Sequence, residues 1–126
     1  MPEENESGVI GDRSFSRDKE IVSNLGKEVI ESFISMGINP VIKHMPGHGR
    51  AEVDSHFNLP VVDTSYNTLI ETDFYPFEFC NFSNLAMTAH VVYSNIDSEL
   101  PATLSTEVIR NAVSYTHLRA HETLLD

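Results

Sequence analysis

Reactive side chains are densest in two neighbouring stretches of the sequence. The first is KHMPGHG, from Lys43 to Gly49, and the second is DSH, from Asp54 to His56. Lysine and imidazole supply hydrogen-bond donors, and an imidazole also exchanges a proton near neutral pH. A carboxylate two positions from an imidazole adds a candidate partner for it. These residue types in this order favour the binding of a polar ligand together with acid/base chemistry.

Asp54 and His56 form the candidate catalytic pair. In a locally extended segment, residues two apart point the same way, so the carboxylate of Asp54 can accept a hydrogen bond from the imidazole of His56. Such a carboxylate fixes the tautomer of the imidazole and supports its charged form, which leaves the far nitrogen free to give or take a proton. His56 is therefore the candidate general acid/base and Asp54 its orienting partner.

The same residues also have plainer interpretations. Spacing alone favours a solvated ion pair in a polar loop for Asp54 and His56. Lys43 can be a lysine at a strand end that extends its amine to water. Imidazoles near one loop can meet one metal ion, so a zinc site built on His44, His48 and His56 is a rival interpretation, although their spacing matches no standard zinc signature.

Other histidines and the cysteine are less informative. His90 follows a predicted strand and either faces the site or is a buried histidine bonded to backbone. His117 and His121 resemble a metal-binding helix, but Glu122 is misplaced for an HExxH motif. Cys80 is most simply a small core residue.

Helix and strand signals alternate around the reactive stretches. Apolar residues at helical spacing predict an amphipathic helix from Asp18 to Met36, followed by Gly37 as its stop. Short apolar runs predict buried strands from Asn39 to Lys43 and from Leu85 to Thr88. A polar stretch from Met45 to Ser65 predicts a long functional loop. The apolar positions of the first helix are Ile21, Leu25, Val29, Ile30 and Phe33.

Two further helices are predicted, from Asn67 to Phe79 and from a Ser105 cap toward Val113. Strands that alternate with helices imply parallel βα units, because parallel neighbours need a crossover connection and a helix is the usual one. In such architectures the loops at the carboxyl ends of strands form the active face. Lys43 and His44 therefore lie where ligand groups are usually bound.

Composition limits the class of protein and its partners. The chain has 126 residues with 40% hydrophobic content, which suits one ordinary soluble domain. Its net charge of -11, from 19 acidic and 8 basic residues, argues against nucleic acid as a partner. A single cysteine favours a reducing, cytoplasmic compartment. The acidic start is unlike a secretory signal, and no apolar run approaches the length of a membrane span, so neither export nor a membrane partner is expected.

Five blocks of the sequence recur together in a known family. They are VIGDRSFSRD, PVIKHMPGHG, VDSH, LAMTAHVVY and PATLS, and they span Val9 to about Ala112. In order and spacing they resemble the bacterial β-N-acetylglucosaminidases of glycoside hydrolase family 3, and KHMPGHG followed by DSH is a long, specific pattern. The resemblance implies a TIM barrel and a retaining enzyme that removes terminal N-acetylglucosamine from cell-wall fragments in the cytoplasm during peptidoglycan recycling.

The resemblance implies a role for each site residue, through the motif in which that residue stands. Arg13, in GDRSF, matches an arginine that binds the substrate, while Lys43 and His44 match the pair that hydrogen-bonds the sugar at the cleavage subsite. His56 matches the histidine acid/base of the family and Asp54 its partner, in agreement with the spacing argument. The expected partner is an amino-sugar saccharide substrate, and no metal or organic cofactor is implied.

The chain also departs from the family pattern. The nucleophilic aspartate of the family lies on a later strand in a block that this chain lacks, and the block of the first strands is absent too. We therefore expect residues 1–113 to be the middle portion of a partial (β/α)8 TIM barrel that is inactive alone, and residues 114–126 to be a non-native tail. The alternative functions are a non-catalytic sugar-binding module and, less favoured, a metal-binding histidine-loop protein.

Overall fold

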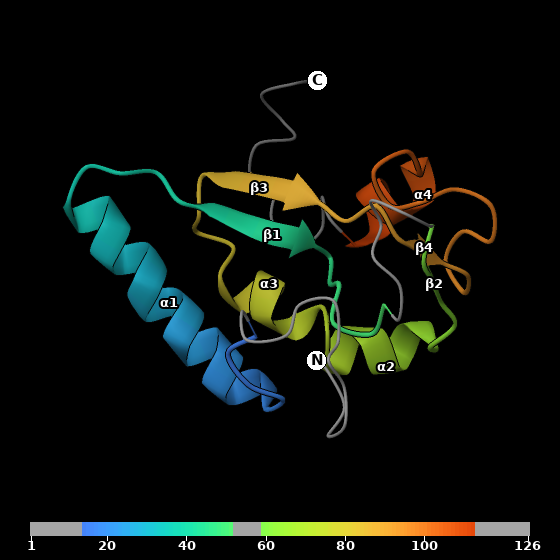
Figure 1. Cartoon of the computed structure of the whole chain (residues 1–126), viewed down its shortest axis with the longest axis horizontal. Coiled ribbons are helices and arrows are strands. Elements are labelled where there is room, and N and C mark those ends of the chain that lie inside the picture. Colours follow the sequence, from blue (N-terminus) through green and yellow to red (C-terminus); the bar gives the residue numbers. More distant parts are fainter. Residues whose placement is uncertain (1–13, 52–58, 113–126) are drawn as a thin grey trace.

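The computed structural model of the chain describes residues 14–51 and 59–112, which form an α/β arrangement with two small parallel sheets (Figure 1). β1 pairs with β3 and β2 pairs with β4, both in parallel. The parallel pairing predicted from the alternation of helices and strands is confirmed. The strands are β1 (Val41–Met45), β2 (Val61–Val62), β3 (Leu85–Thr88) and β4 (Val92–Tyr93).

The helices pack around these strands. α1 and α3 contact each other on one side of the β1–β3 pair, and β2, β4 and α4 gather near the ends to which β1 and β3 point (Figure 1). None of the helices in the described ranges is long and apolar enough to cross a membrane. The helices are α1 (Lys19–Ser35), α2 (Tyr66–Glu71), α3 (Tyr75–Phe79) and α4 (Thr106–Val108).

Helix α1 has the boundaries that the sequence predicts. The side chain of Asp18 accepts a hydrogen bond from the backbone N–H of Glu20, which caps the first turn. At the other end Gly37 adopts a φ of 78°, the left-handed conformation that ends a helix and that glycine adopts without steric cost.

The apolar face predicted for α1 does not face the core. Ile21, Leu25, Val29 and Phe33 are 38% to 48% exposed, and Ile30 alone among the predicted apolar positions is buried. The buried side of the helix instead carries Ser23 and Ile30. The outward apolar stripe of α1 therefore has no cover from the part of the chain that the structure describes.

Cys80 packs against the inner side of α1, next to Ser23 and Gly26. A methyl group on Gly26 would lie 3.4 Å from the Cys80 sulfur, and the Cys80 thiol donates to the backbone carbonyl of Ser23 at 3.7 Å. The methyl group would be at an ordinary van der Waals distance, so the Cys80 sulfur packs against α1 without excluding an alanine at position 26. Burial raises the pKa of the Cys80 thiol to about 11, and the residue is a core cysteine, as its sequence context indicates.

The single helix predicted from Asn67 to Phe79 is wrong, because the chain forms α2 and α3 with a break between them. The backbone N–H of Phe74 bonds the carbonyl of Leu69, which closes α2. Pro76 lies in the first turn of α3, where its missing N–H costs nothing, whereas inside a continuous helix it would remove a hydrogen bond. The break leaves Asp73 buried between the two helices.

The strand predicted from Asn39 to Lys43 begins and ends two residues later. Met45 is completely buried, and its carbonyl accepts from the backbone N–H of Ala89 at 2.6 Å, so the ladder continues beyond Lys43 despite a shift in register. β2 and β4 are missing from the sequence prediction, because two residues are too few to display an alternating pattern. The loop predicted from Met45 to Ser65 thus contains β2.

The last predicted helix starts at its predicted cap, Ser105, and changes from an α-helix to a π-helix after one turn. The hydroxyl of Ser105 accepts from the backbone N–H of Val108 at 3.1 Å and donates to Asp97 at 2.6 Å. The helix continues as a π-helical turn over residues 109–112. Val113, the predicted end, lies outside the described residues.

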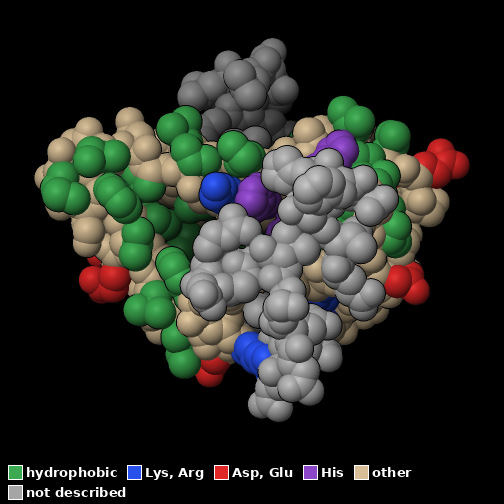
Figure 2. All heavy atoms as spheres, viewed as in Figure 1, with side chains coloured by type: hydrophobic (Ala, Val, Ile, Leu, Met, Phe, Trp, Pro, Cys, Tyr) green, Lys and Arg blue, Asp and Glu red, His purple; other side chains and the backbone are tan. Residues whose placement is uncertain are grey.

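Burial is concentrated at one end of the structure. The main cluster of buried side chains joins β2, β4, α2 and α4, with Leu69, Tyr93 and Val108 at most 1% exposed. At the other end Val41, Leu85 and Met87 of the β1–β3 pair are about half exposed, like the outer side of α1. Figure 2 shows hydrophobic side chains gathered over the end of the molecule that holds α1 and the β1–β3 pair.

We predict that the isolated chain of 126 residues binds a hydrophobic dye and self-associates. Its exposed apolar side chains, and the outer edges of β1 and β3, which no other described strand pairs with, offer surfaces on which other chains can pack. Dye fluorescence and size-exclusion chromatography measure these properties. A monomer that unfolds in one sharp thermal transition without binding dye would contradict the prediction.

Candidate active site

The candidate site begins on β1, at the edge of the sheet where both parallel strands end. Lys43 is exposed and stands opposite Met87 of β3, and His44 is half-buried next to it. The Lys43–His44 and Met45–Pro46 peptide bonds are both cis. Lys43 and His44 therefore occupy the position predicted for them, with an ammonium group and an imidazole beside the carboxyl ends of the strands.

The turn after β1 brings a second imidazole to the first. The ring centroids of His44 and His48 are 5.4 Å apart, and the ring planes are inclined by 51°. The sequence places His48 only in the rival zinc interpretation, and the structure shows that it borders His44. The sequence could have indicated this contact, because His48 directly follows Met45-Pro46-Gly47. A segment this short keeps His48 close to the end of the strand.

The other predicted site residues do not fall within residues 14–51 or 59–112. Arg13, Asp54 and His56 lie outside the described residues. Their predicted roles, in substrate binding and in acid/base catalysis, stay predictions.

A buried carboxylate lies under the turn. Asp73 is 8% exposed and accepts hydrogen bonds from the side chains of Arg50, at 2.9 Å, and Thr72, at 2.9 Å. Arg50 also donates to the hydroxyl of Thr72 at 3.3 Å. Sequence reasoning missed this cluster because Arg50 and Asp73 are far apart along the chain and belong to no common motif.

Tyr93 is buried in the core cluster, near enough to Asp73 to be affected by its charge. Its ring packs edge-on against Phe74, with centroids 5.7 Å apart, and its hydroxyl has no hydrogen-bond partner among the described residues. Burial and then the negative charge of Asp73 raise the pKa of Tyr93 far above its usual value. The hydroxyl therefore stays protonated at any pH at which an enzyme works.

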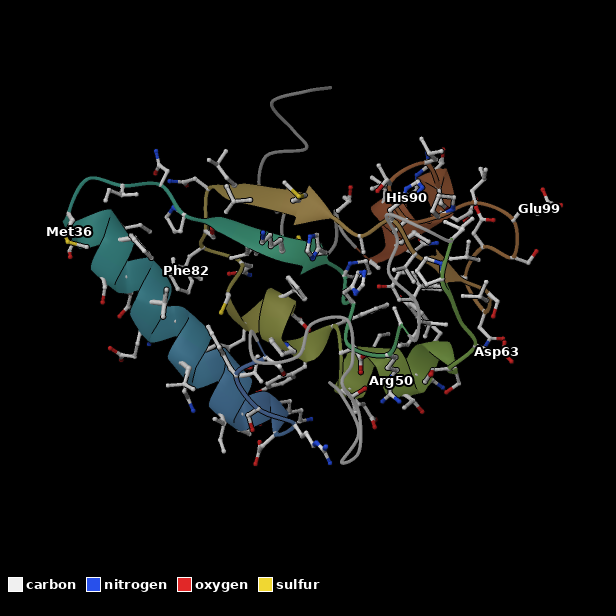
Figure 3. All side chains as sticks on the ribbon, in the orientation of Figure 1. Met36, Arg50, Asp63, Phe82, His90 and Glu99 are labelled. Carbon is white, nitrogen blue, oxygen red and sulfur yellow. The ribbon has the colours of Figure 1, made fainter. Side chains whose placement is uncertain are left out.

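His90 lies after β3, on the chain between β3 and β4. It is exposed, so the alternative of a buried histidine is wrong, and Figure 3 shows it beside α4, apart from Arg50 near α2. Within residues 14–51 and 59–112, no three histidine, cysteine or acidic side chains are grouped so that they could hold a metal ion. The rival zinc interpretation also involves His56, which the structure does not describe.

A family model described as the glycosyl hydrolase family 3 N terminal domain matches residues 2–115. Curated relatives named beta-hexosaminidase include those of Nitrosospira multiformis, 39% identical over 102 residues, and Thioalkalivibrio sulfidiphilus, 43% identical over 106 residues. These alignments cover 79% and 82% of this chain but only 29% and 30% of the relatives.

Solved structures agree with the sequence matches. A glycoside hydrolase family 3 beta-N-acetylglucosaminidase from Paenibacillus sp. str. FPU-7 is similar with a TM-score of 0.79 and 37% identity, over 84% of this chain and 21% of that one. NagZ from Neisseria gonorrhoeae, solved in complex with N-trifluoroacetyl-D-glucosamine, has a TM-score of 0.77 and 35% identity, over 84% of this chain and 32% of that one. The chain spans at most about a third of these proteins.

We predict that Tyr93→Phe leaves the free energy of unfolding unchanged or raises it by about 1 kcal/mol. The substitution removes a buried hydroxyl that has no partner within residues 14–51 and 59–112 and that is costly to desolvate, and it keeps the ring contact with Phe74. Tyr93→Ala is the contrast, because loss of the ring is expected to cost about 3–5 kcal/mol. Urea unfolding of the complete polypeptide measures both. A loss above about 1 kcal/mol for Tyr93→Phe would mean that the hydroxyl has a partner.

Proposed function

The chain belongs to glycosyl hydrolase family 3, and from this membership we propose that the complete protein hydrolyses terminal β-linked N-acetylglucosamine from saccharides. The placement of Lys43 and His44 at the carboxyl ends of two parallel strands carries the proposal, because ligand groups are bound at that edge in βα folds. The beta-hexosaminidase names of the relatives and the amino-sugar derivative held by the NagZ structure support it.

We propose further that residues 1–113 are the middle portion of a (β/α)8 barrel. The parallel pairing of β1 with β3, with helices packed beside it, supports a barrel segment. The exposed apolar side chains of α1 and of the two strands fit such a segment, because the neighbouring barrel strands and helices would cover them.

Within this barrel, the proposed roles separate binding from chemistry. Lys43, His44 and Arg13 hydrogen-bond the sugar. His56 gives a proton to the leaving oxygen and later takes one from water, and Asp54 orients the imidazole and supports its charge. Retention of configuration needs a second group on the opposite face of the sugar to form a glycosyl-enzyme intermediate. We place that nucleophile on a later strand, beyond these 126 residues.

The natural substrate and compartment are narrower proposals. We propose that the saccharides are fragments of peptidoglycan and that the enzyme is cytoplasmic. The likeness of the KHMPGHG and DSH blocks to bacterial enzymes of cell-wall recycling supports the first proposal. The free, buried thiol of Cys80 fits a reducing compartment and supports the second.

In the complete polypeptide, we predict that His56→Ala slows hydrolysis of a sugar aglycone by about 100- to 10,000-fold, since proton donation to the leaving oxygen is lost. An aryl glycoside with an acidic phenol hardly needs a proton to depart, so its glycosylation step should suffer much less. Asp54→Asn should also reduce the rate, because the imidazole can adopt the wrong tautomer. Steady-state kinetics with both classes of substrate provide the measurement.

Lys43→Ala is the matched contrast for this experiment. Loss of a sugar-binding donor should weaken affinity for every substrate, whatever its leaving group. If His56→Ala slowed good and poor leaving groups equally, and Lys43→Ala discriminated between them, the acid/base assignment would be reversed.

We predict that deletion of Ser114 to Asp126 leaves the stability and sugar binding of the chain unchanged, because we propose that this tail is no part of the barrel. Denaturant unfolding and binding of N-acetylglucosamine measure the two properties. A loss of more than about 1 kcal/mol in the free energy of unfolding, the usual effect of removing real packing, would refute the proposal.

A further inference from the structure

His48 borders the candidate site but has no role in the proposed reaction. Its imidazole lies 5.4 Å from that of His44, measured between ring centroids, and the two ring planes are inclined by 51°. Aromatic rings attract each other at centroid separations of about 4.5–7 Å when their planes are not simply face to face. Both residues are half-buried. A ring held this close restricts how the imidazole of His44 can turn.

Orientation matters more for an imidazole than for an ammonium group. The last side-chain torsion of histidine has broad minima, and its two nitrogens stand at fixed places on a planar ring. Rotation of the His44 ring would therefore turn away the nitrogen that is aimed at a sugar hydroxyl. Lys43 carries three equivalent donors on a flexible stem and needs less guidance. Of the two proposed sugar-binding groups on β1, His44 is thus the one that gains from a neighbouring ring.

The turn that carries His48 is held on both sides of that residue. Just before it, a methyl group on Gly47 would lie 3.1 Å from the Cβ of Asp73, so the backbone packs directly against that side chain. Just after it, the backbone N–H of Ala51 donates to the carbonyl of His48 at 3.0 Å, and Ala51 belongs to the buried core cluster. His48 therefore stands on a fixed stretch of backbone.

Asp73 is a firm support for this turn. Its side chain is 5% exposed and accepts hydrogen bonds from Arg50 and Thr72, each at 2.9 Å. A buried carboxylate is costly unless it is well bonded, so these contacts keep it in one place. The junction of α2 and α3, where Asp73 lies, thus supports the turn on which His48 stands.

We propose that His48 is a positioning residue, which holds the imidazole of His44 at the angle needed to hydrogen-bond the sugar. This inference rests on the proposed function, because it takes the sugar-binding role of His44 from there. In this role His48 does not touch the substrate; it supplies the surface against which the His44 ring rests. A binding group that is already oriented loses less affinity to the entropy of ordering.

Binding and turnover in the complete polypeptide that contains this chain test the role. For His48→Ala we expect KM and the inhibition constant of N-acetylglucosamine to rise together by about 3- to 10-fold, with little change in kcat. The loss should be equal for a sugar aglycone and an aryl glycoside, because His44 binds the sugar and not the leaving group. His48→Phe keeps a ring but no ring nitrogen, so we expect it to restore most of the affinity.

Gly47→Ala disturbs the same contact from the other side of the turn. The added methyl group would meet the Cβ of Asp73 at 3.1 Å, which is tighter than most such contacts, so the turn must shift by a few tenths of an ångström. That shift moves the ring of His48 relative to its neighbour. We expect weaker binding with little change in kcat, the same pattern as for His48→Ala.

A double variant separates orientation from general damage. With His44→Ala already in place, neither His48→Ala nor Gly47→Ala should weaken binding further, because no imidazole is left to orient. Phe79→Ala is the matched control, because it removes another ring contact, with Tyr75 at 6.4 Å between centroids, from α3. We expect this control to leave KM and the inhibition constant unchanged.

The results separate the positioning role of His48 from the binding role of His44. If His48→Phe binds as weakly as His48→Ala, His48 acts through its own nitrogens and the positioning role is wrong. If His48→Ala weakens binding equally in the His44→Ala background, the ring contact is structural only and the proposal is also wrong. If His48→Ala does not fold, Gly47→Ala gives the same comparison. If His44→Ala leaves binding unchanged, the proposed function fails at that residue and the inference falls with it. If His44→Ala weakens binding and His48→Ala does not, only the positioning role fails.

Discussion

Parallel pairing of β1 with β3 is the constraint on which the rest of the structure depends. Two parallel strands start at the same end of a sheet, so the chain must return along the outside before the second begins. That return contains β2, α2 and α3, and it places the α2–α3 junction under the turn that leaves β1. The same pairing, extended by the bond from Ala89 to Met45, holds Lys43 and His44 at the edge where the strands end.

The stabilising contacts are unevenly distributed because the two small sheets have different surroundings. β2 and β4 are covered by α2 and α4, and their side chains join one buried cluster. β1 and β3 are held to each other by backbone hydrogen bonds but keep Val41 and Met87 about half exposed. Helix α1 repeats the imbalance, since it buries Ser23 against α3 and turns Leu25 outward. The apolar pattern in the sequence therefore predicts a larger core than the described residues form.

The sequence predicts the features that depend on local signals and misses those that depend on contacts between distant residues. The limits of α1 follow from local signals, the Asp18 cap and the left-handed Gly37, which act without the rest of the fold. Its orientation was wrong, because periodicity identifies an apolar stripe but not what covers it. The sequence prediction missed the break before α3 because it did not treat Pro76 as the start of a new helix. It also missed the ion pair of Arg50 with Asp73, because no local pattern connects these two positions. The place of Lys43 and His44 at the end of a strand was predicted correctly, because the end of a strand is itself a local signal.

A histidine acid changes what the surrounding structure must supply. A glutamic acid has an ordinary pKa near 4.3, so it must be buried or placed beside another negative charge before it can hold a proton at neutral pH. A histidine titrates near 6.5 without that help, and burial would only lower its pKa. An imidazole acid, the role that we propose for His56, therefore does not need a buried setting to hold its proton. The demand on the protein then shifts from tuning a pKa to fixing the position of the imidazole.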